Sequence, residues 1–169
     1  MTSDLKLAIR PATPADRPAL ERLWLMFRHD MSEFGGQLPN PDGTFRSERL
    51  EAAFSGDVDW AAYLVSRGGH PVGFALVRGL SGATRVLNSF FVVRGARRTG
   101  VGMRAVRDVV ARHPGQWTIA FQDDNTGAVR FWRRVAEALA PGDWTEERRS
   151  VPQRADLAPD VWVSFGYPG

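Results

Sequence analysis

The chain of 169 residues has no cysteine, a single lysine and only three histidines. Without cysteine it has no disulfide, no thiol nucleophile and no thiolate metal ligand. The histidines, His29, His70 and His113, are too widely spaced to match a known metal-binding pattern. No apolar run approaches the roughly 20 residues of a membrane-spanning helix, and residues 1–6 lack the basic-then-apolar pattern of a signal peptide. We therefore expect a cytoplasmic protein that binds no metal and no membrane.

Nearly all of the positive charge comes from arginine, because Lys6 is the only lysine. The formal net charge is only +3, yet the isoelectric point is near 10.1. Arginine does not titrate below about pH 12, so a small positive excess persists far up the pH scale. We interpret this basic character as a field for a cofactor phosphate rather than as a DNA- or RNA-binding face. Nucleic acid is therefore not an expected partner.

Length and composition fit one domain with one hydrophobic core, because 43% of the residues are hydrophobic and no repeat or linker interrupts the chain. We expect residues 1–169 to form this single domain. Apolar periodicity and turn residues predict its elements. The predicted strands are 5–10, 59–67, 71–80, 84–93, 116–121, 144–151 and 161–165, and the predicted helices are 47–54, 101–112, 125–139 and a first helix that starts at Pro14 behind the N-cap Thr13.

The most informative segment joins the predicted strand 84–93 to the helix 101–112. The apolar end of the strand, Phe90–Val93, leads into a basic loop that contains Gly100 and Gly102. Glycine lets a backbone approach a ligand closely, and the first amides of a helix point outward without partners. The helix dipole and the flanking arginines favour an anion at this point, so the segment predicts a pyrophosphate-binding loop. A plain helix N-terminus is the alternative interpretation.

The loop Arg97-Arg98-Thr99-Gly100-Val101-Gly102 resembles the Arg/Gln-x-x-Gly-x-Gly/Ala loop of the GCN5-related N-acetyltransferase (GNAT) superfamily. That loop binds the pyrophosphate of acetyl-coenzyme A (acetyl-CoA). Residues 9–16 and the order of predicted elements also resemble this superfamily, most closely small bacterial members described only as predicted acetyltransferases. The resemblance implies an α/β fold, a single domain with a mixed, mostly antiparallel central sheet and helices on both faces.

A second motif, Asn125 to Trp132, is similar to the Asn-x-x-Ala-x-x-Phe-Tyr pattern of many members. Its Asn lies near the pantetheine in the family and its Phe packs beside the cofactor. Asn125 also reads as a helix N-cap and Phe131 as a core residue. The full set of cofactor-binding residues that the resemblance implies is Phe90, Phe91, Val92, Val93, Arg97, Arg98, Thr99, Gly100, Val101, Gly102, Met103, Asn125, Phe131 and Trp132.

Position 132 departs from the family pattern, in which a tyrosine hydroxyl protonates the departing thiolate. Trp132 has an N–H but no hydroxyl, so it cannot act as a general acid near neutral pH. A thiol has a pKa near 8.5, however, so its thiolate is already a fair leaving group. Transfer therefore does not require the missing tyrosine.

The acceptor site is predicted from residues that the resemblance places around the thioester. Asp30 and Glu33, near the end of the first helix, are the candidate catalytic bases for a cationic amine, with a solvated helix end as the alternative. Asn88 and Ser89 are polar residues in an apolar strand, and with Phe27 they are assigned to the substrate pocket.

These predictions lead to transfer of an acetyl group from acetyl-CoA to a primary amine, by direct attack in a ternary complex. A non-catalytic acyl-CoA-binding module and an acetyltransferase acting on RNA or protein are the alternatives. The acceptor is left open between a small-molecule amine and a protein amine. A homodimer is one assembly that the sequence leaves open.

Overall fold

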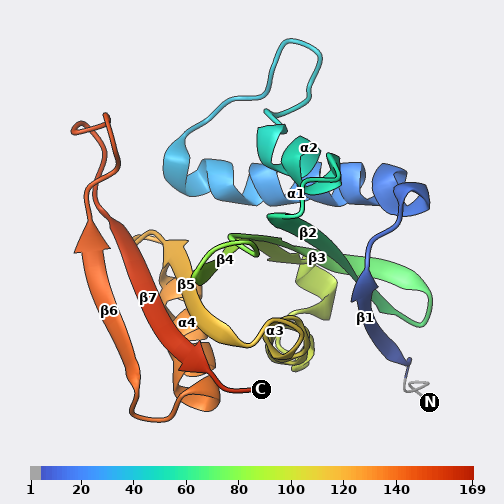
Figure 1. Ribbon diagram of the computed structural model, residues 1–169. Coiled ribbons are helices and arrows are strands. Elements are labelled where there is room, and N and C mark those ends of the chain that lie inside the picture. The colour runs from blue at the N-terminus through green and yellow to red at the C-terminus, as the bar shows by residue number, and fades with distance from the viewer. Residues whose placement is uncertain (1–4) are drawn as a thin grey trace.

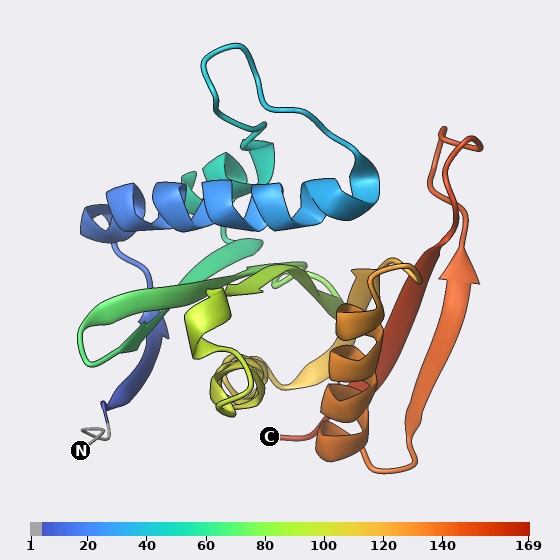
Figure 2. The same ribbon diagram turned by 180° about the vertical axis from the view of Figure 1, so that it is seen from behind.

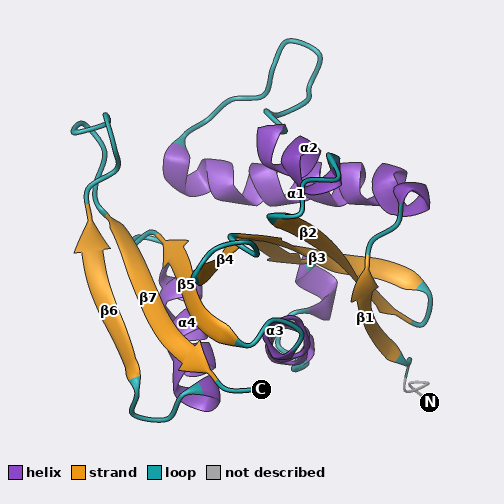
Figure 3. Ribbon diagram, viewed as in Figure 1, coloured by secondary structure: helices purple, strands orange, loops and turns teal. Residues whose placement is uncertain are grey.

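Residues 5–169 are described by a computed structural model of the chain, shown in Figures 1–3. The strands are β1 (Leu7–Pro11), β2 (Trp60–Arg67), β3 (His70–Arg78), β4 (Thr84–Val92), β5 (Gly115–Phe121), β6 (Trp144–Arg149) and β7 (Asp160–Tyr167). The helices are α1 (Arg17–Gly35), α2 (Glu48–Phe54), α3 (Val101–Ala111) and α4 (Thr126–Leu139). Two short 3₁₀ turns, η1 (Pro14–Asp16) and η2 (Arg94–Ala96), precede α1 and α3.

All seven strands belong to one open sheet with the order β1-β2-β3-β4-β5-β7-β6. Only β4 and β5 run parallel, and every other neighbouring pair is antiparallel. The parallel pair needs a crossover connection, which α3 supplies between the two strands. The predicted mixed, mostly antiparallel sheet is confirmed.

Helices cover both faces of the sheet, as predicted (Figures 1 and 2). On one face, α1 and α2 bury apolar side chains such as Leu20, Trp24 and Leu50 against Phe74 and Leu76 of β3. On the other face, the valine stripe of α3 and the apolar side of α4 pack against β5 and β7. Burial of these side chains on both faces is the main source of the fold's stability.

The first helix begins later than its sequence pattern predicts. Residues 14–16 form the 3₁₀ turn η1, and the α-helix starts at Arg17, whose N–H bonds to the Pro14 carbonyl. Pro18 has no N–H and cannot make the next helical bond back to Pro14, so a regular α-helix cannot run through this turn. At its other end α1 stops at Gly36, which adopts a left-handed conformation with φ of 66°. Within residues 5–169, none of the helices is long and apolar enough to cross a lipid bilayer.

Candidate active site

The two parallel strands at the centre of the sheet separate soon after they begin. β4 and β5 pair only at Thr84, Arg85 and Val86, opposite residues 116–118. The rest of β4, residues 87–92, and the end of β5, residues 119–121, pair with each other nowhere. Backbone polar groups along the inner edges of this gap therefore lack a strand partner, and such groups bind ligands readily. We call this gap the β4–β5 opening.

The basic glycine loop follows directly from the open end of β4. Arg98 and Gly100 both have a positive φ, of 61° and 80°, which folds the loop tightly before α3 begins. The Thr99 hydroxyl fastens the loop by donating to the Ala96 carbonyl at 2.6 Å. The first helical bond of α3 joins Arg104 N to Gly100 O, so the amides of residues 101–103 have no partner within the helix. Together with the helix dipole, these amides form an anion site of the predicted kind.

Side chains of β4 alternate between the two faces of the sheet beside this opening. Phe90 and Val92 lie on the α3 and α4 face, while Phe91 packs beneath α1. Val93 contacts the core beneath α1 and the small cluster that holds Val101 under the loop. Most of these side chains pack in the hydrophobic core, so the predicted binding of the cofactor by these residues would use their backbone groups.

An aromatic cluster of Phe90, Phe131 and Trp132 lies beside the opening on the α4 side. The Phe90 and Phe131 rings stack with centroids 5.9 Å apart, and Trp132 meets both edge-on, at 5.5 Å and 4.7 Å. Trp132 is only 7% exposed. A Cβ atom at Gly102 would lie 3.2 Å from Phe131, so this glycine allows the loop and the aromatic cluster to meet. The two sequence motifs, far apart in the chain, therefore meet at one place, and Met103 packs at the margin of the same core.

Asp30 links α1 to the glycine loop. Its two carboxylate oxygens accept hydrogen bonds from Arg94 at 2.9 Å and from Arg97 at 2.6 Å. Arg97 also donates to the Val92 carbonyl at 2.7 Å and lies over the Phe91 ring. The guanidinium of Arg97 thus points back toward α1, where it ties the loop to the strand end and the helix.

The surroundings of Asp30 bear on its predicted role as a base. Partial burial acts to raise the pKa of this carboxyl, but the hydrogen bonds and charges of Arg97 and Arg94 outweigh burial and lower it. A carboxylate held in this way accepts a proton less readily. Glu33, one turn further along α1, is exposed and makes no ion pair among residues 5–169. Nothing in the structure tests either residue as a base, so both assignments stay predictions.

The other predicted site residues take up different positions. Asn88 lies at a bulge of β4, where the pairing with β3 shifts between Leu76 and Val77. Bulges are frequent near active sites because they redirect side chains. Ser89 is buried and donates to the Asn88 side chain at 3.2 Å. Phe27 is 7% exposed within the aromatic core beneath α1, so it offers little surface to a substrate. Asn125 caps α4, and its side chain accepts from the Ala128 amide at 3.1 Å.

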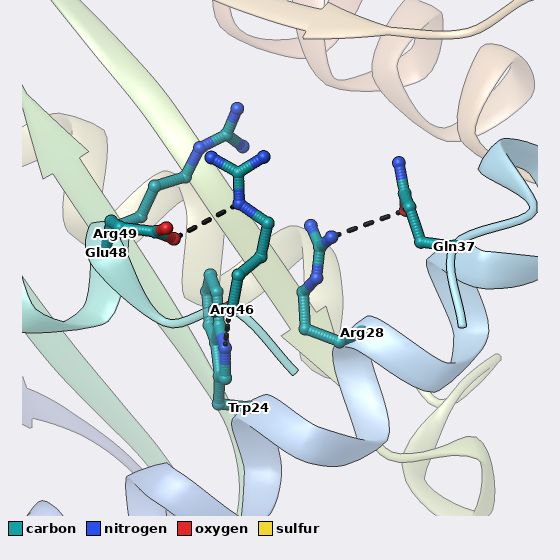
Figure 4. Close-up of a pocket in the computed structure, with 6 residues that line it drawn as sticks. All are labelled: Trp24, Arg28, Gln37, Arg46, Glu48 and Arg49. Carbon is teal, nitrogen blue, oxygen red and sulfur yellow. Dashed lines mark hydrogen bonds and ion pairs between the residues drawn. The ribbon is translucent and has the colours of Figure 1, made fainter. Parts of the chain in front are cut away.

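One feature of this region was missed from the sequence. A recess of about 160 Å³ lies between α1 and the start of α2, and three arginines line it (Figure 4). Its lining consists of Trp24, Arg28, Gln37, Arg46, Glu48 and Arg49. The Trp24 indole donates to the Arg46 carbonyl at 3.0 Å and so fixes the end of the connecting loop against α1. We call this the arginine recess.

One protein-family model matches most of this chain. The model of the acetyltransferase (GNAT) family matches residues 22–136, which include most of α1, the glycine loop and most of α4. The chain therefore belongs to this family. A search of curated protein sequences finds no match.

Solved structures agree over nearly the whole length. An acetyltransferase from Thermus thermophilus is 18% identical, with a TM-score of 0.69 over 96% of this chain and 98% of that one. A GNAT family acetyltransferase from Elizabethkingia anophelis, solved with acetyl-CoA bound, is 12% identical, with a TM-score of 0.62 over 95% and 97%. The ribosomal-protein-S18-alanine N-acetyltransferase of Escherichia coli is 11% identical, with a TM-score of 0.65 over 97% and 96%. At these identities the comparison shows the shared fold.

Proposed function

We propose that the protein is an N-acetyltransferase that transfers an acetyl group from acetyl-CoA to a primary amine. The observation that carries this proposal is the β4–β5 opening, which ends at the glycine loop and at the unpartnered amides of α3. Family membership supports acetyl transfer in general. The similar structure of an alanine N-acetyltransferase supports an amine as the acceptor. The similar structure with acetyl-CoA bound supports acetyl-CoA as the cosubstrate.

The residues of the chain divide the work between binding and positioning. The amides of residues 101–103 hold the pyrophosphate, with Arg98 adding positive charge. Backbone groups of β4 around Phe90, together with the Val92 amide, face the opening and hold the amide-rich arm of the cosubstrate, while the Val92 carbonyl is taken by Arg97. Phe131 packs beside this arm. Bound acetyl-CoA supplies an activated acetyl group as a thioester. The acceptor amine attacks directly while both substrates are bound, so proximity provides much of the rate.

Proton transfer is assigned to the carboxylates near the end of α1. Asp30 is engaged by two guanidinium groups, so Glu33 is the better placed of the two predicted bases to take a proton from the attacking amine, directly or through water. Solvent protonates the departing thiolate, because Trp132 has no hydroxyl. A thiolate with a conjugate pKa near 8.5 leaves without a strong acid.

The first test is binding of acetyl-CoA followed by thiol release with a panel of primary amines. A ligand at about 100 times its dissociation constant adds about 2.7 kcal/mol of stability, which raises the melting temperature of a domain of this size by roughly 5–10 °C. Binding with turnover supports the enzyme. Binding without turnover by any amine would instead identify a non-catalytic acyl-CoA-binding module, and no thermal shift at millimolar acetyl-CoA would refute the cosubstrate.

A further inference from the structure

The arginine recess holds positive charge that the protein does not neutralise. Among residues 5–169, Arg28 and Arg49 make no ion pair, and Arg46 has one, with Glu48 at 3.2 Å. An Arg28 Nη atom donates to the neutral side chain of Gln37 at 3.3 Å, and its Nε is buried without a hydrogen-bond partner. Figure 4 shows the three guanidinium groups extending toward the same side of the recess. The lining of the recess thus holds three cations and one carboxylate, that of Glu48.

The three guanidinium groups repel one another, most of all at the partly buried Arg28. Burial lowers the pKa of Arg28, and repulsion by Arg49 and Arg46 lowers it further. The pKa of Arg49 is lowered by desolvation and then by Arg46 and Arg78, although the residue is exposed and Asp160 and Glu48 act to raise it. Arginine nevertheless stays charged at neutral pH, so the repulsion persists. An anion bound among these side chains would relieve it and complete the hydrogen bonding of Arg28.

The recess lies on the face of the sheet that carries α1 and α2, and its lining comes from α1, the loop after it and the start of α2. Arg49 is close enough to Arg78 and Asp160 for their charges to affect one another. Arg78 pairs with Val86, the last residue of β4 that pairs with β5. Asp160 begins β7 beside the end of β5. Arg49 thus lies near the strands on either side of the β4–β5 opening, on the face of the sheet opposite α3.

The chemistry of the recess selects a class of ligand. The planar guanidinium group forms paired hydrogen bonds with carboxylate and phosphate oxygens. The volume of about 160 Å³ is roughly ten times the space that one buried water needs. A carboxylate or phosphate group with a short part of its parent molecule fits this volume. A cationic amine such as a polyamine does not suit the three arginines.

We propose that Arg28, Arg46 and Arg49 bind an anionic group, a carboxylate or a phosphate, carried by the amine that the protein acetylates. This inference rests on the proposed function and narrows its acceptor to amines with an acidic group. The anion anchors the acceptor in the recess, and the amine extends into the β4–β5 opening.

The test compares amine acceptors that carry an acidic group with partners that lack it. One pair is β-alanine and β-alaninamide, and a second is O-phosphoethanolamine and ethanolamine, each assayed by thiol release from acetyl-CoA. We expect kcat/KM for at least one anionic acceptor to exceed that of its neutral partner by about tenfold or more. The pair that shows the larger ratio distinguishes a carboxylate from a phosphate.

Two variants then assign the preference to the recess. Arg28→Gln and Arg49→Gln should each lower the ratio of kcat/KM between the anionic and the neutral acceptor several-fold, mainly by raising KM for the anionic acceptor. Arg107→Gln, an exposed arginine of α3 on the other face of the sheet, is the matched control and should change nothing. The thermal shift with acetyl-CoA should be the same in all variants, which shows that the cosubstrate site is intact.

A second measurement separates this inference from the proposed function. With coenzyme A present at saturation to occupy the glycine loop, inorganic phosphate or glutarate should raise the melting temperature of the wild type and not of the Arg28→Gln/Arg49→Gln variant. This result supports the recess even if no amine in the panel turns over. The inference would be overturned if charged and neutral acceptors were used equally well, or if neither phosphate nor glutarate raised the melting temperature of the wild type. Neither result would contradict acetyl transfer itself.

Discussion

Replacement of Trp132 is the perturbation that best separates packing from catalysis at this site. The side chain is 7% exposed and meets the Phe90 and Phe131 rings at 5.5 Å and 4.7 Å. A buried tryptophan removes about 200–250 Å² from water. At about 25 cal/mol per Å² this corresponds to roughly 5–6 kcal/mol as an upper value.

Trp132→Ala should therefore lower the free energy of unfolding by about 3–5 kcal/mol, through lost burial and the cavity left behind. For a domain of this size the melting temperature should fall by roughly 10 °C or more. Calorimetry or thermal unfolding followed by circular dichroism measures both quantities. A fall of less than about 2 °C would contradict the packing of this ring.

The catalytic part of the prediction uses Trp132→Tyr and Trp132→Phe, which differ from each other only by a hydroxyl group. Both keep an aromatic ring against Phe90, so their stabilities and their KM values for acetyl-CoA should be alike. If residue 132 faces the sulfur, kcat of the tyrosine variant should exceed that of the phenylalanine variant by about threefold or more, because a phenol can protonate the thiolate. Equal kcat values from about pH 6 to 9, across the thiol pKa, would show that protonation of the thiolate by residue 132 does not limit turnover, and a structure with coenzyme A in which residue 132 is remote from the sulfur would refute this placement.

Two other positions give sharp expectations. Gly102→Ala should keep the fold and weaken acetyl-CoA binding modestly, because its methyl group would lie 3.2 Å from Phe131. Gly102→Glu should abolish the thermal shift with acetyl-CoA, because it adds a carboxylate at the anion site. Asp30→Asn should lower stability by about 1 kcal/mol and weaken acetyl-CoA binding, since Arg94 and Arg97 lose their partner. The folded-state pKa of Asp30 is lowered, so its contribution is present above the unfolded pKa of about 3.9 and is lost as pH falls through the folded value. Unfolding titrations from pH 7 to about pH 3 should show wild type and Asp30→Asn converging only at the acid end.

Most of the fold followed from local patterns in the sequence. Alternating apolar residues located the strands, and the valine stripe of the helix after the glycine loop located its buried face. The predicted start of α1 differs from the observed one because an N-cap and a proline at the first position are good helix signals, whereas Pro18 prevents the next helical hydrogen bond. The glycine loop was predictable because its glycines, arginines and flanking elements are neighbours in the chain.

The parts of the site that sequence did not predict depend on contacts between distant residues. Asp30 meets Arg94 and Arg97 across 64 and 67 positions, and no periodic pattern marks such a pair. The arginine recess forms because the loop after Gly36 brings Arg46 and Arg49 back to α1. The three-residue spacing of Arg46 and Arg49 is visible in the sequence, but their approach to Arg28 depends on how that loop closes.

Asp30 and Arg28 are two positions apart on α1, and they belong to two different charged regions. Asp30 pairs with the arginines of the glycine loop, whereas Arg28 lines the arginine recess. Asp30 neutralises Arg94 and Arg97 at the glycine loop, which leaves the α3 amides and Arg98 as the anion site there. Within the described part of the chain, residues 5–169, Arg28 forms no ion pair, and the one carboxylate in the recess lining is that of Glu48. Without Asp30 the charges of Arg94 and Arg97 would be free at the glycine loop, where inorganic phosphate would compete with the pyrophosphate of the cosubstrate. Asp30→Asn should therefore make acetyl-CoA binding more sensitive to inhibition by inorganic phosphate, measured as the inhibition constant against acetyl-CoA. An unchanged inhibition constant would show that Asp30 only fastens the loop.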